Sequence, residues 1–542
     1  MVKVAEAIGR TLVDLGVEQA FGVVGSGNFR LTEAMRSRGV RFVAARQETS
    51  AVTAADGYSA VTGRVGIATV HQGPGFTNAV TGLVEAAKSR SPVLLVAADT
   101  PDAWVHSNFR VDQRAIAEAG GVAVVRPTDA GSVRAALARA WELTASERRA
   151  TALLLPLDVL DTAVPEGFGA IETPRPVPPA APSRDDVSRA VELAAVAARP
   201  VIIAGRGAVL AGAREPILRF AHAIGARLAT SAVANGLFQG HPGNLGISGG
   251  FASPDAAEAI GSADLVVSFG ASLSRWTTKH GRLIADGARV IQVDHEAAAI
   301  GVHQPVDVGI VSDARLAAEA LAEAADGTCR PQDHTTAPAR PWREMPFEDA
   351  STDATIDPRT LTIHLDALLP SARTVVVDGG HFSGWPTMYL RVPDASGFIF
   401  HQAFQSIGLG LGTAIGVAVG RPDRLTVAAV GDGCAFMALG ELETAARVEA
   451  PLLVLVYNDD AYGAEIHHFA ADGLPLDTVR FPPSDLAAVA RAIGCDGVTV
   501  RSTADLARVE AWLAGKRRRP LVVDAKVSAD VVGAWLPEAF RA

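Results

Sequence analysis

The chain has 542 residues and a formal net charge of −10, and 49% of its residues are apolar while 20% are charged. This length is too great for one hydrophobic core and predicts about three domains. The acidic charge argues against a nucleic-acid partner, and no apolar run in the sequence is long enough to cross a membrane.

The N-terminal segment predicts an amphipathic helix rather than a signal peptide, because acidic and basic groups interrupt what would be the apolar core of such a peptide. The three cysteines (Cys329, Cys434 and Cys495) are widely spaced and form no metal-binding or disulfide pattern. Such cysteine usage is typical of a reducing compartment, so we expect a cytoplasmic protein.

Two linkers divide the chain. Residues 171–183 are dense in proline, and residues 326–356 are polar with four further prolines. We therefore expect three domains, with boundaries at 1–170, 184–326 and 357–542. Each alternates short apolar runs with longer helical patterns, which predicts an α/β fold of three doubly wound parallel sheets.

The predicted strands follow in chain order. They are residues 19–24, 41–45, 66–70, 92–97 and 150–155 in the first block, 200–208, 265–271 and 289–294 in the second, and 374–378, 451–457 and 520–524 in the third. The first and third blocks look like two versions of one α/β plan.

The third block contains the most informative motif, Gly431-Asp432-Gly433, followed further along by Asn458-Asp459. We expect residues 434–447 to form one helix between two buried parallel strands. Glycines let the backbone approach an anion, and a helix N-terminus offers free N–H groups to phosphate oxygens. Asp432 and Asp459 could then hold a hard divalent cation against that phosphate.

In the first block, Arg46-Gln47-Glu48 follows a predicted strand and begins a helix, and a glycine turn comes at Gly73-Pro74-Gly75. Alone, Glu48 is best interpreted as a solvated acid in a first helical turn. Together with the glycine–aspartate motif, a functional interpretation is favoured. The whole chain then resembles the acetolactate synthase, benzoylformate decarboxylase and pyruvate decarboxylase superfamily of thiamine-diphosphate enzymes.

The resemblance implies a pyrimidine-binding domain, a middle domain and a diphosphate-binding domain. It implies that Glu48 contacts N1′ of the cofactor pyrimidine, and that Mg²⁺ is held by Asp432, Asp459 and the carbonyl of Ala461. Ile407 would force the cofactor into a bent shape, and the carbonyl of Gln405 would accept a hydrogen bond from its 4′-amino group. The other residues expected to contact the cofactor are Gly73, Asn78, His381, Ser383, Gly431, Gly433, Cys434 and Tyr462.

Three further residues are candidates for contact with the substrate. Ser26 and His71 stand where benzoylformate decarboxylase carries a serine and a histidine, and Glu465 aligns with a catalytic glutamate of pyruvate decarboxylase. Alternatively, His71 packs the cofactor loop and Glu465 is a solvated helix acid. His467 and His468 replace the Gln-Trp pair of acetohydroxyacid synthases, a departure from acetolactate synthesis.

The resemblance thus implies decarboxylation of a 2-oxo acid, followed by release of an aldehyde or by ligation to a second carbonyl. One alternative is an FAD-containing oxidase or synthase, because Gly205-Arg206-Gly207 follows a predicted strand; the full dinucleotide fingerprint is absent, so a structural role is favoured. Another is a catalytically silent paralogue. The resemblance also implies a homodimer or homotetramer whose active sites lie between subunits.

Overall fold

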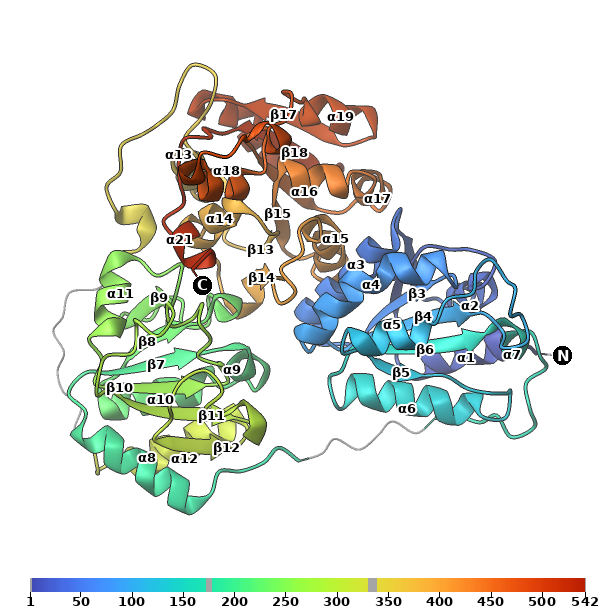
Figure 1. Ribbon diagram of the computed structural model, residues 1–542, viewed down its shortest axis with the longest axis horizontal. Helices are drawn as coiled ribbons and strands as arrows, with labels where there is room; N and C mark the ends of the chain where they lie inside the picture. The colour runs from blue at the N-terminus through green and yellow to red at the C-terminus, as the bar shows by residue number, and fades with distance from the viewer. Residues whose placement is uncertain (1, 172–177, 330–338, 542) are drawn as a thin grey trace.

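The computed structural model describes residues 2–171, 178–329 and 339–541. These residues form three α/β domains, each built on a six-stranded sheet with helices on its faces (Figure 1). Every strand pair within the three sheets is parallel. The predicted fold class is therefore confirmed. No helix of the described ranges is long and apolar enough to span a membrane.

The N-terminal sheet has the strand order β2-β1-β3-β4-β6-β5. Its strands are β1 (Gln19–Gly22), β2 (Arg41–Ala44), β3 (Gly66–Val70), β4 (Val93–Asp99), β5 (Ala123–Val125) and β6 (Thr151–Pro156). Its helices are α1 (Val4–Asp14), α2 (Phe29–Arg36), α3 (Glu48–Thr62), α4 (Pro74–Lys88), α5 (Gln113–Ala119), α6 (Val133–Ala145) and α7 (Leu157–Leu160). The expected helix at Glu48 is present.

The middle sheet has the order β12-β11-β10-β7-β8-β9. Its strands are β7 (Pro200–Ala204), β8 (Arg227–Thr230), β9 (Asn244–Ile247), β10 (Leu265–Phe269), β11 (Arg289–Asp294) and β12 (Val308–Val311). Its helices are α8 (Arg184–Val196), α9 (Arg206–Leu210), α10 (Arg214–Ile224), α11 (Pro254–Gly261) and α12 (Ala314–Ala325).

The C-terminal sheet has the order β14-β13-β15-β16-β18-β17. Its strands are β13 (Arg373–Val377), β14 (Phe398–Phe400), β15 (Leu425–Gly431), β16 (Leu452–Asn458), β17 (Asp496–Val500) and β18 (Leu521–Lys526). Its helices are α13 (Pro358–Leu368), α14 (Gly384–Tyr389), α15 (Gly410–Gly420), α16 (Asp432–Met437), α17 (Glu441–Arg447), α18 (Gly463–Phe469), α19 (Leu486–Ala492), α20 (Ala507–Ala514) and α21 (Leu536–Ala539).

The N-terminal and C-terminal sheets have the same strand order when their strands are numbered within each domain. The helix α3 follows the second strand of its domain, as α15 does in the other, and α4 corresponds to the α16–α17 segment. The expected likeness of the first and third blocks is thus confirmed as a structural repeat.

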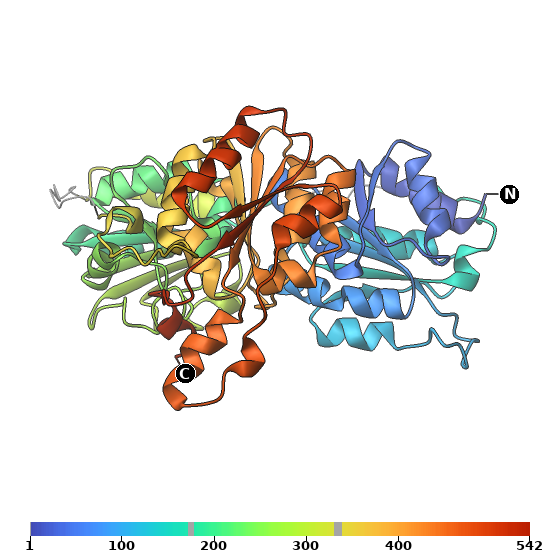
Figure 2. The same cartoon turned by 90° about the horizontal axis from the view of Figure 1, so that it is seen from above.

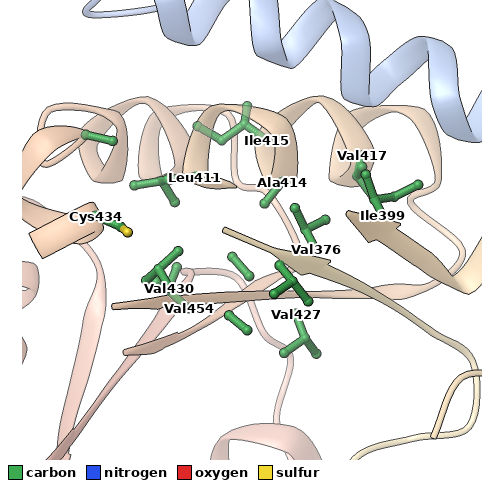
Figure 3. Packing of buried hydrophobic residues seen from close by; sticks show 14 of the residues in the cluster. Val376, Ile399, Leu411, Ala414, Ile415, Val417, Val427, Val430, Cys434 and Val454 are labelled. Atoms are coloured by element: carbon green, nitrogen blue, oxygen red, sulfur yellow. The ribbon is translucent and has the colours of Figure 1, made fainter. Parts of the chain in front are cut away.

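The helix α15 joins the two repeats. One face packs on the C-terminal sheet, where Leu411 and Ala414 meet valines of β13 and β15 (Figure 3). The other face meets α3 of the N-terminal domain at glycine positions. A Cβ atom on Gly416 would lie 1.8 Å from the carbonyl oxygen of Ala54, so only glycine permits this approach. The C-terminal domain lies above the other two in Figure 1 and between them in the view of Figure 2.

The prediction of a single helix over residues 434–447 is wrong. The structure has two short helices, α16 and α17, with a break at residues 438–440. The break lies where Gly440 approaches the N-terminal domain, since a Cβ atom there would be 3.1 Å from Cβ of Arg46. This tertiary contact places Glu441, the first residue of α17, against the other domain.

Candidate active site

The carboxyl ends of β13, β15 and β16 meet at one edge of the C-terminal sheet and enclose a cavity of about 250 Å³. Its lining residues all come from the C-terminal domain. Of the predicted site residues, the lining includes His381, Ile407, Gly431, Asp432, Gly433, Cys434, Asp459, Ala461, Tyr462 and Glu465. Clefts at the carboxyl ends of parallel strands are the usual ligand sites of such sheets.

Two carboxylates face each other in this cavity. Asp432 follows β15 and is buried, whereas Asp459 follows β16 and is half-buried. Burial raises the pKa of Asp432 to about 6. Burial, followed by repulsion from Asp432, raises the pKa of Asp459 to about 7. A divalent cation would remove this repulsion, and carboxylate and carbonyl oxygens are the ligands that Mg²⁺ prefers, so the residues fit such an ion.

These two pKa values predict a pH dependence. Because both pKa values are raised above the ordinary 3.8, the contribution of the two carboxyl groups to the stability of the metal-free fold is greatest below pH 3.8. This contribution is lost as the pH rises through about 6 to 7. A bound cation favours the ionised carboxylates and therefore reverses the loss. We expect Mg²⁺ alone to raise the melting temperature by several degrees at about pH 8 and negligibly at about pH 5. Scanning calorimetry measures this, and equal shifts at both pH values would contradict it.

The glycine turns beside Asp432 are tied together by a thiol. Cys434 donates a hydrogen bond from Sγ to the carbonyl oxygen of Gly379, at 3.1 Å. Burial holds the pKa of Cys434 well above its usual value, so the thiol keeps its proton. This contact joins the turn after β15 to the turn after β13.

His381 directly follows the turn after β13 and forms part of the cavity wall. Burial, followed by the nearby His467, lowers the pKa of His381 to about 3, so the ring is neutral. Its Nε2 accepts a hydrogen bond from the N–H of Gly533 at 3.0 Å, and Trp535 stacks on the ring with centroids 5.6 Å apart. The sequence analysis missed Gly533 and Trp535, because their role depends on the C-terminal segment returning to this domain.

The loop between β14 and α15 carries Ile407 into the cavity. Gln405, two residues earlier, is exposed and has φ of 60°, a strained value for a residue with a side chain. The buried carboxylate of Asp378 accepts hydrogen bonds from the N–H groups of Gly408 (3.0 Å) and Gly410 (2.8 Å). Burial nevertheless raises the pKa of Asp378 to about 6. Asp378 therefore anchors the loop on the far side of Ile407.

The remaining residues predicted for this domain lie at different depths. Glu465 lines the rim of the cavity and is exposed, in the first turn of α18. Ser383 is buried next to the turn after β13 but is not among the lining residues. The ring of His468 stacks on Phe540, the residue that follows α21, with centroids 3.9 Å apart.

A second group of predicted residues lies on the N-terminal domain. Glu48 begins α3 and is half-buried, and its Oε2 accepts a hydrogen bond from Nδ2 of Asn78 on α4 at 3.2 Å. Gly75 lies between Glu48 and His71, since a Cβ atom there would be 3.1 Å from Cβ of His71 and 3.4 Å from Oε1 of Glu48. Gly73, with φ of 65°, begins the turn and donates its N–H to Gln113.

His71 and Ser26 complete this group. Nδ1 of His71 lies 2.8 Å from the carbonyl oxygen of Gln72 and is placed to donate a hydrogen bond to it; in the tautomer with its proton on Nδ1, Nε2 is an acceptor. The hydroxyl of Ser26 lies 3.2 Å from that Nε2 and can donate to it. Phe109 packs edge-on against the His71 ring, with centroids 5.0 Å apart, and was missed by the sequence analysis. The group thus presents a hydroxyl, an imidazole and a carboxyl group.

The proposed FAD loop has another physical explanation. A Cβ atom on Gly207 would lie 2.7 Å from Cα of Gly270, and one on Gly270 would lie 2.5 Å from Cα of Gly207. These glycines therefore allow the turns after β7 and β10 to pack directly on each other. Their presence is accounted for by this packing, as the structural interpretation expects.

Family models match all three domains of the chain. The N-terminal TPP-binding domain of thiamine pyrophosphate enzymes matches residues 2–118, their central domain matches residues 187–321, and their C-terminal TPP-binding domain matches residues 378–525. The chain belongs to the thiamine pyrophosphate enzyme family. Thiamine pyrophosphate is thiamine diphosphate, so the predicted family is confirmed.

Curated relatives match over most of their length. A probable 2-ketoarginine decarboxylase of Pseudomonas aeruginosa is 30% identical over 93% of this chain and 90% of its own. A sulfoacetaldehyde acetyltransferase of Alcaligenes xylosoxydans is 27% identical over 93% of this chain and 89% of its own. An acetolactate synthase of Mycobacterium bovis is 27% identical, with 97% of this chain and 88% of its own covered.

A solved structure shows the same fold. The thiamine diphosphate-dependent 4-hydroxybenzoylformate decarboxylase of Rhodococcus jostii superposes with a TM-score of 0.83 at 22% identity, covering 97% of this chain and 99% of the other. The family includes decarboxylases and acyl- or acetyltransferases, so this chain is a thiamine-diphosphate-dependent enzyme of that group.

Proposed function

We propose that this enzyme binds thiamine diphosphate with Mg²⁺ and decarboxylates a 2-oxo acid, releasing an aldehyde or ligating the remaining fragment to a second carbonyl. The observation that supports it best is the convergence of Asp432 and Asp459 beside glycine turns in one cavity. The cofactor, when bound, supplies a carbon nucleophile and an electron sink for the departing carboxylate. The chain supplies binding, orientation and proton positions.

We assign the following roles to the residues of the chain. Asp432, Asp459 and the carbonyl of Ala461 hold the cation and thereby the diphosphate. Ile407 would pack against the cofactor, and the carbonyl of Gln405 would accept a hydrogen bond from its amino group. Glu48 would hydrogen-bond to N1′ of the pyrimidine and help the bound cofactor to accept a proton. Gly73, Asn78, His381, Ser383, Gly433, Cys434 and Tyr462 complete the cofactor contacts in this proposal.

The substrate would contact residues around the cofactor. The hydroxyl of Ser26 can hydrogen-bond a carboxylate or carbonyl oxygen of the substrate, and the adjacent Nε2 of His71 can exchange a proton with the hydroxyl or with the substrate. Glu465, exposed at the rim, can serve as a proton donor or acceptor once a substrate excludes water. We keep these three residues as candidates for catalysis.

We further propose an active site shared between two copies of the chain. The cavity that holds Asp432 is lined by the C-terminal domain alone, whereas Glu48 and His71 belong to a separate group on the N-terminal domain. Large apolar side chains are exposed beside both groups: Phe109 and Trp104 on one domain, Phe436 and Met437 on the other. A dimer, or a tetramer built from two dimers, would cover them and complete each site.

One experiment tests the reaction. We expect the protein, supplied with thiamine diphosphate and Mg²⁺, to release carbon dioxide from at least one member of a panel of 2-oxo acids. Each acid is incubated with and without an acceptor aldehyde, and the products are identified by mass spectrometry. Omission of the cofactor is the control, and a panel without cofactor-dependent product argues for a catalytically silent protein. An absorption spectrum of the purified protein decides whether a flavin is present.

A further inference from the structure

The boundary between the N-terminal and C-terminal domains contains two fully buried glutamates. Glu85 on α4 is 0% exposed, and Glu441 at the start of α17 is 1% exposed. Buried carboxylates are costly unless hydrogen bonds satisfy them, so their partners indicate what they hold. Both find those partners in the backbone of the other domain.

Glu85 holds the loop that leads to Ile407. Its Oε1 accepts a hydrogen bond from the N–H of Ala403 at 3.0 Å, and its Oε2 accepts one from the N–H of Phe404 at 2.7 Å. Oε1 also accepts from the hydroxyl of Ser89, at 2.8 Å. Glu85 thus fixes the loop before the strained Gln405, while Asp378 fixes it after Ile407.

Glu441 holds the loop that leads to Glu48. Its Oε1 accepts hydrogen bonds from the N–H groups of Arg46 and Gln47, both at 3.0 Å. Its Oε2 is buried near the hydroxyls of Ser50 and Thr444, without a hydrogen-bond partner among the described residues. Glu48 is the next residue along the chain and begins α3.

The two contacts are equivalent under the structural repeat. The helix α4 and the α16–α17 segment follow the third strand of their domains, and the two anchored loops follow the second. In each domain, therefore, a buried glutamate accepts hydrogen bonds from a loop of the other domain, and each of these two loops leads to a predicted cofactor residue. We infer that Glu85 and Glu441 form a reciprocal interdomain clamp that positions Ile407 and Glu48 for catalysis.

The catalytic part of this inference rests on the proposed function. In the proposed dimer, Glu48 serves the cofactor of the neighbouring chain, whereas Ile407 serves that of its own chain. The boundary between the N-terminal and C-terminal domains of one chain would then position Glu48 for one active site of the dimer and Ile407 for the other. Glu85 and Glu441 touch neither cofactor nor substrate, and they act as positioning residues.

The side-chain geometry predicts different responses to conservative substitution. Glutamine at position 441 keeps one acceptor oxygen for both N–H groups and places its amide nitrogen near two hydroxyls. Both oxygens of Glu85 accept a hydrogen bond from a backbone N–H. Glutamine at position 85 replaces one of these oxygens with an NH₂ group, which is a donor, so at least one of the two hydrogen bonds is lost. Methionine at either position keeps a similar volume and removes both acceptors.

Hydrogen–deuterium exchange of the metal- and cofactor-free protein tests the clamp itself. We expect Glu85→Met to accelerate exchange about tenfold in the peptide containing residues 403–404, and Glu441→Met to do so for residues 46–47. Glu441→Gln should exchange like the wild type, and Glu85→Gln should lie between wild type and Glu85→Met. Glu443→Gln is the matched control, because Glu443 pairs with the Arg46 side chain at the same boundary and accepts no hydrogen bond from a backbone N–H of the described residues.

Kinetics and calorimetry test the positioning role. We expect Glu441→Met to lower kcat about tenfold with little change in thiamine-diphosphate affinity, because Glu48 acts in activation rather than retention of the cofactor. Glu85→Met should weaken cofactor affinity about tenfold, because Ile407 shapes the binding site. Glu441→Gln should restore kcat.

The outcomes separate the two proposals. Exchange that stays unchanged in the opposite domain, or rises uniformly over the protein, overturns the clamp. Localised exchange without the expected changes in kcat and affinity overturns its positioning role. A wild-type protein without cofactor-dependent turnover overturns the proposed function, while the exchange measurement still decides whether the clamp exists. If a methionine variant does not fold, the contrast between the two glutamine variants decides instead.

Discussion

Replacing Glu48 with glutamine is expected to lower kcat by about two to four orders of magnitude. The amide keeps the size of the side chain and can still accept the hydrogen bond from Asn78. It cannot supply the carboxylate that, in the proposed function, favours the reactive tautomer of the pyrimidine. Steady-state kinetics on a substrate found with the 2-oxo acid panel measures the loss.

The affinity for thiamine diphosphate should remain broadly unchanged in Glu48→Gln, because in the proposed function the C-terminal domain holds the diphosphate and the cation. Calorimetry checks this, and Glu18→Gln, an exposed acid of the same domain, is the control. Wild-type turnover by Glu48→Gln would remove Glu48 from the mechanism. Loss of cofactor affinity instead of turnover would make Glu48 a binding residue.

The local motifs could be predicted from sequence because all strands of a parallel sheet run in the same direction, so residues that follow neighbouring strands lie at the same edge of the sheet. Asp432 and Asp459 each follow a long apolar run, and the carboxyl ends of neighbouring parallel strands meet at one edge of a sheet. Their shared place in the cavity therefore followed from two short segments. Glu48 at the start of α3 followed in the same way from a strand, a turn and a helical pattern.

The interdomain contacts could not be predicted from the same patterns. Glu85 and Glu441 each bind backbone N–H groups of the other domain, and any residue except proline can offer such a group. No sequence pattern therefore marks the partner. The break before α17 lies at the same boundary, where Gly440 approaches Arg46 of the N-terminal domain.

The contacts of His381 with Trp535 and Gly533 could not be predicted from short motifs either. Trp535 and Gly533 come from the C-terminal segment, far along the chain from the turn after β13. Arg282 of the middle domain pairs with Glu538 in α21, so the position of this segment depends on a third domain. The surroundings of His381 thus depend on how the middle and C-terminal domains pack, and short motifs do not encode this packing.

Replacing Asp432 with alanine is expected to abolish the binding of thiamine diphosphate. The variant loses one of the two carboxylates that face the proposed cation, and the diphosphate would then lie beside Asp459 without a bound counter-charge. Calorimetry with Mg²⁺ present measures the affinity. Asp472→Ala is the control, because it removes an exposed acid outside the cavity. Unchanged cofactor affinity in Asp432→Ala would contradict the assigned metal site.

The same variant tests whether the site is shared between chains. Glu48→Gln and Asp432→Ala chains are each expected to be inactive alone, but co-expressed chains that carry different tags form mixed dimers. In such a dimer, intact Glu48 of one chain meets intact Asp432 of the other, so one of its two sites works. Random pairing of equal amounts should restore about a quarter of the wild-type sites. If each chain instead completed its own site, every site in the mixture would carry a substitution, and verified mixed dimers would remain inactive.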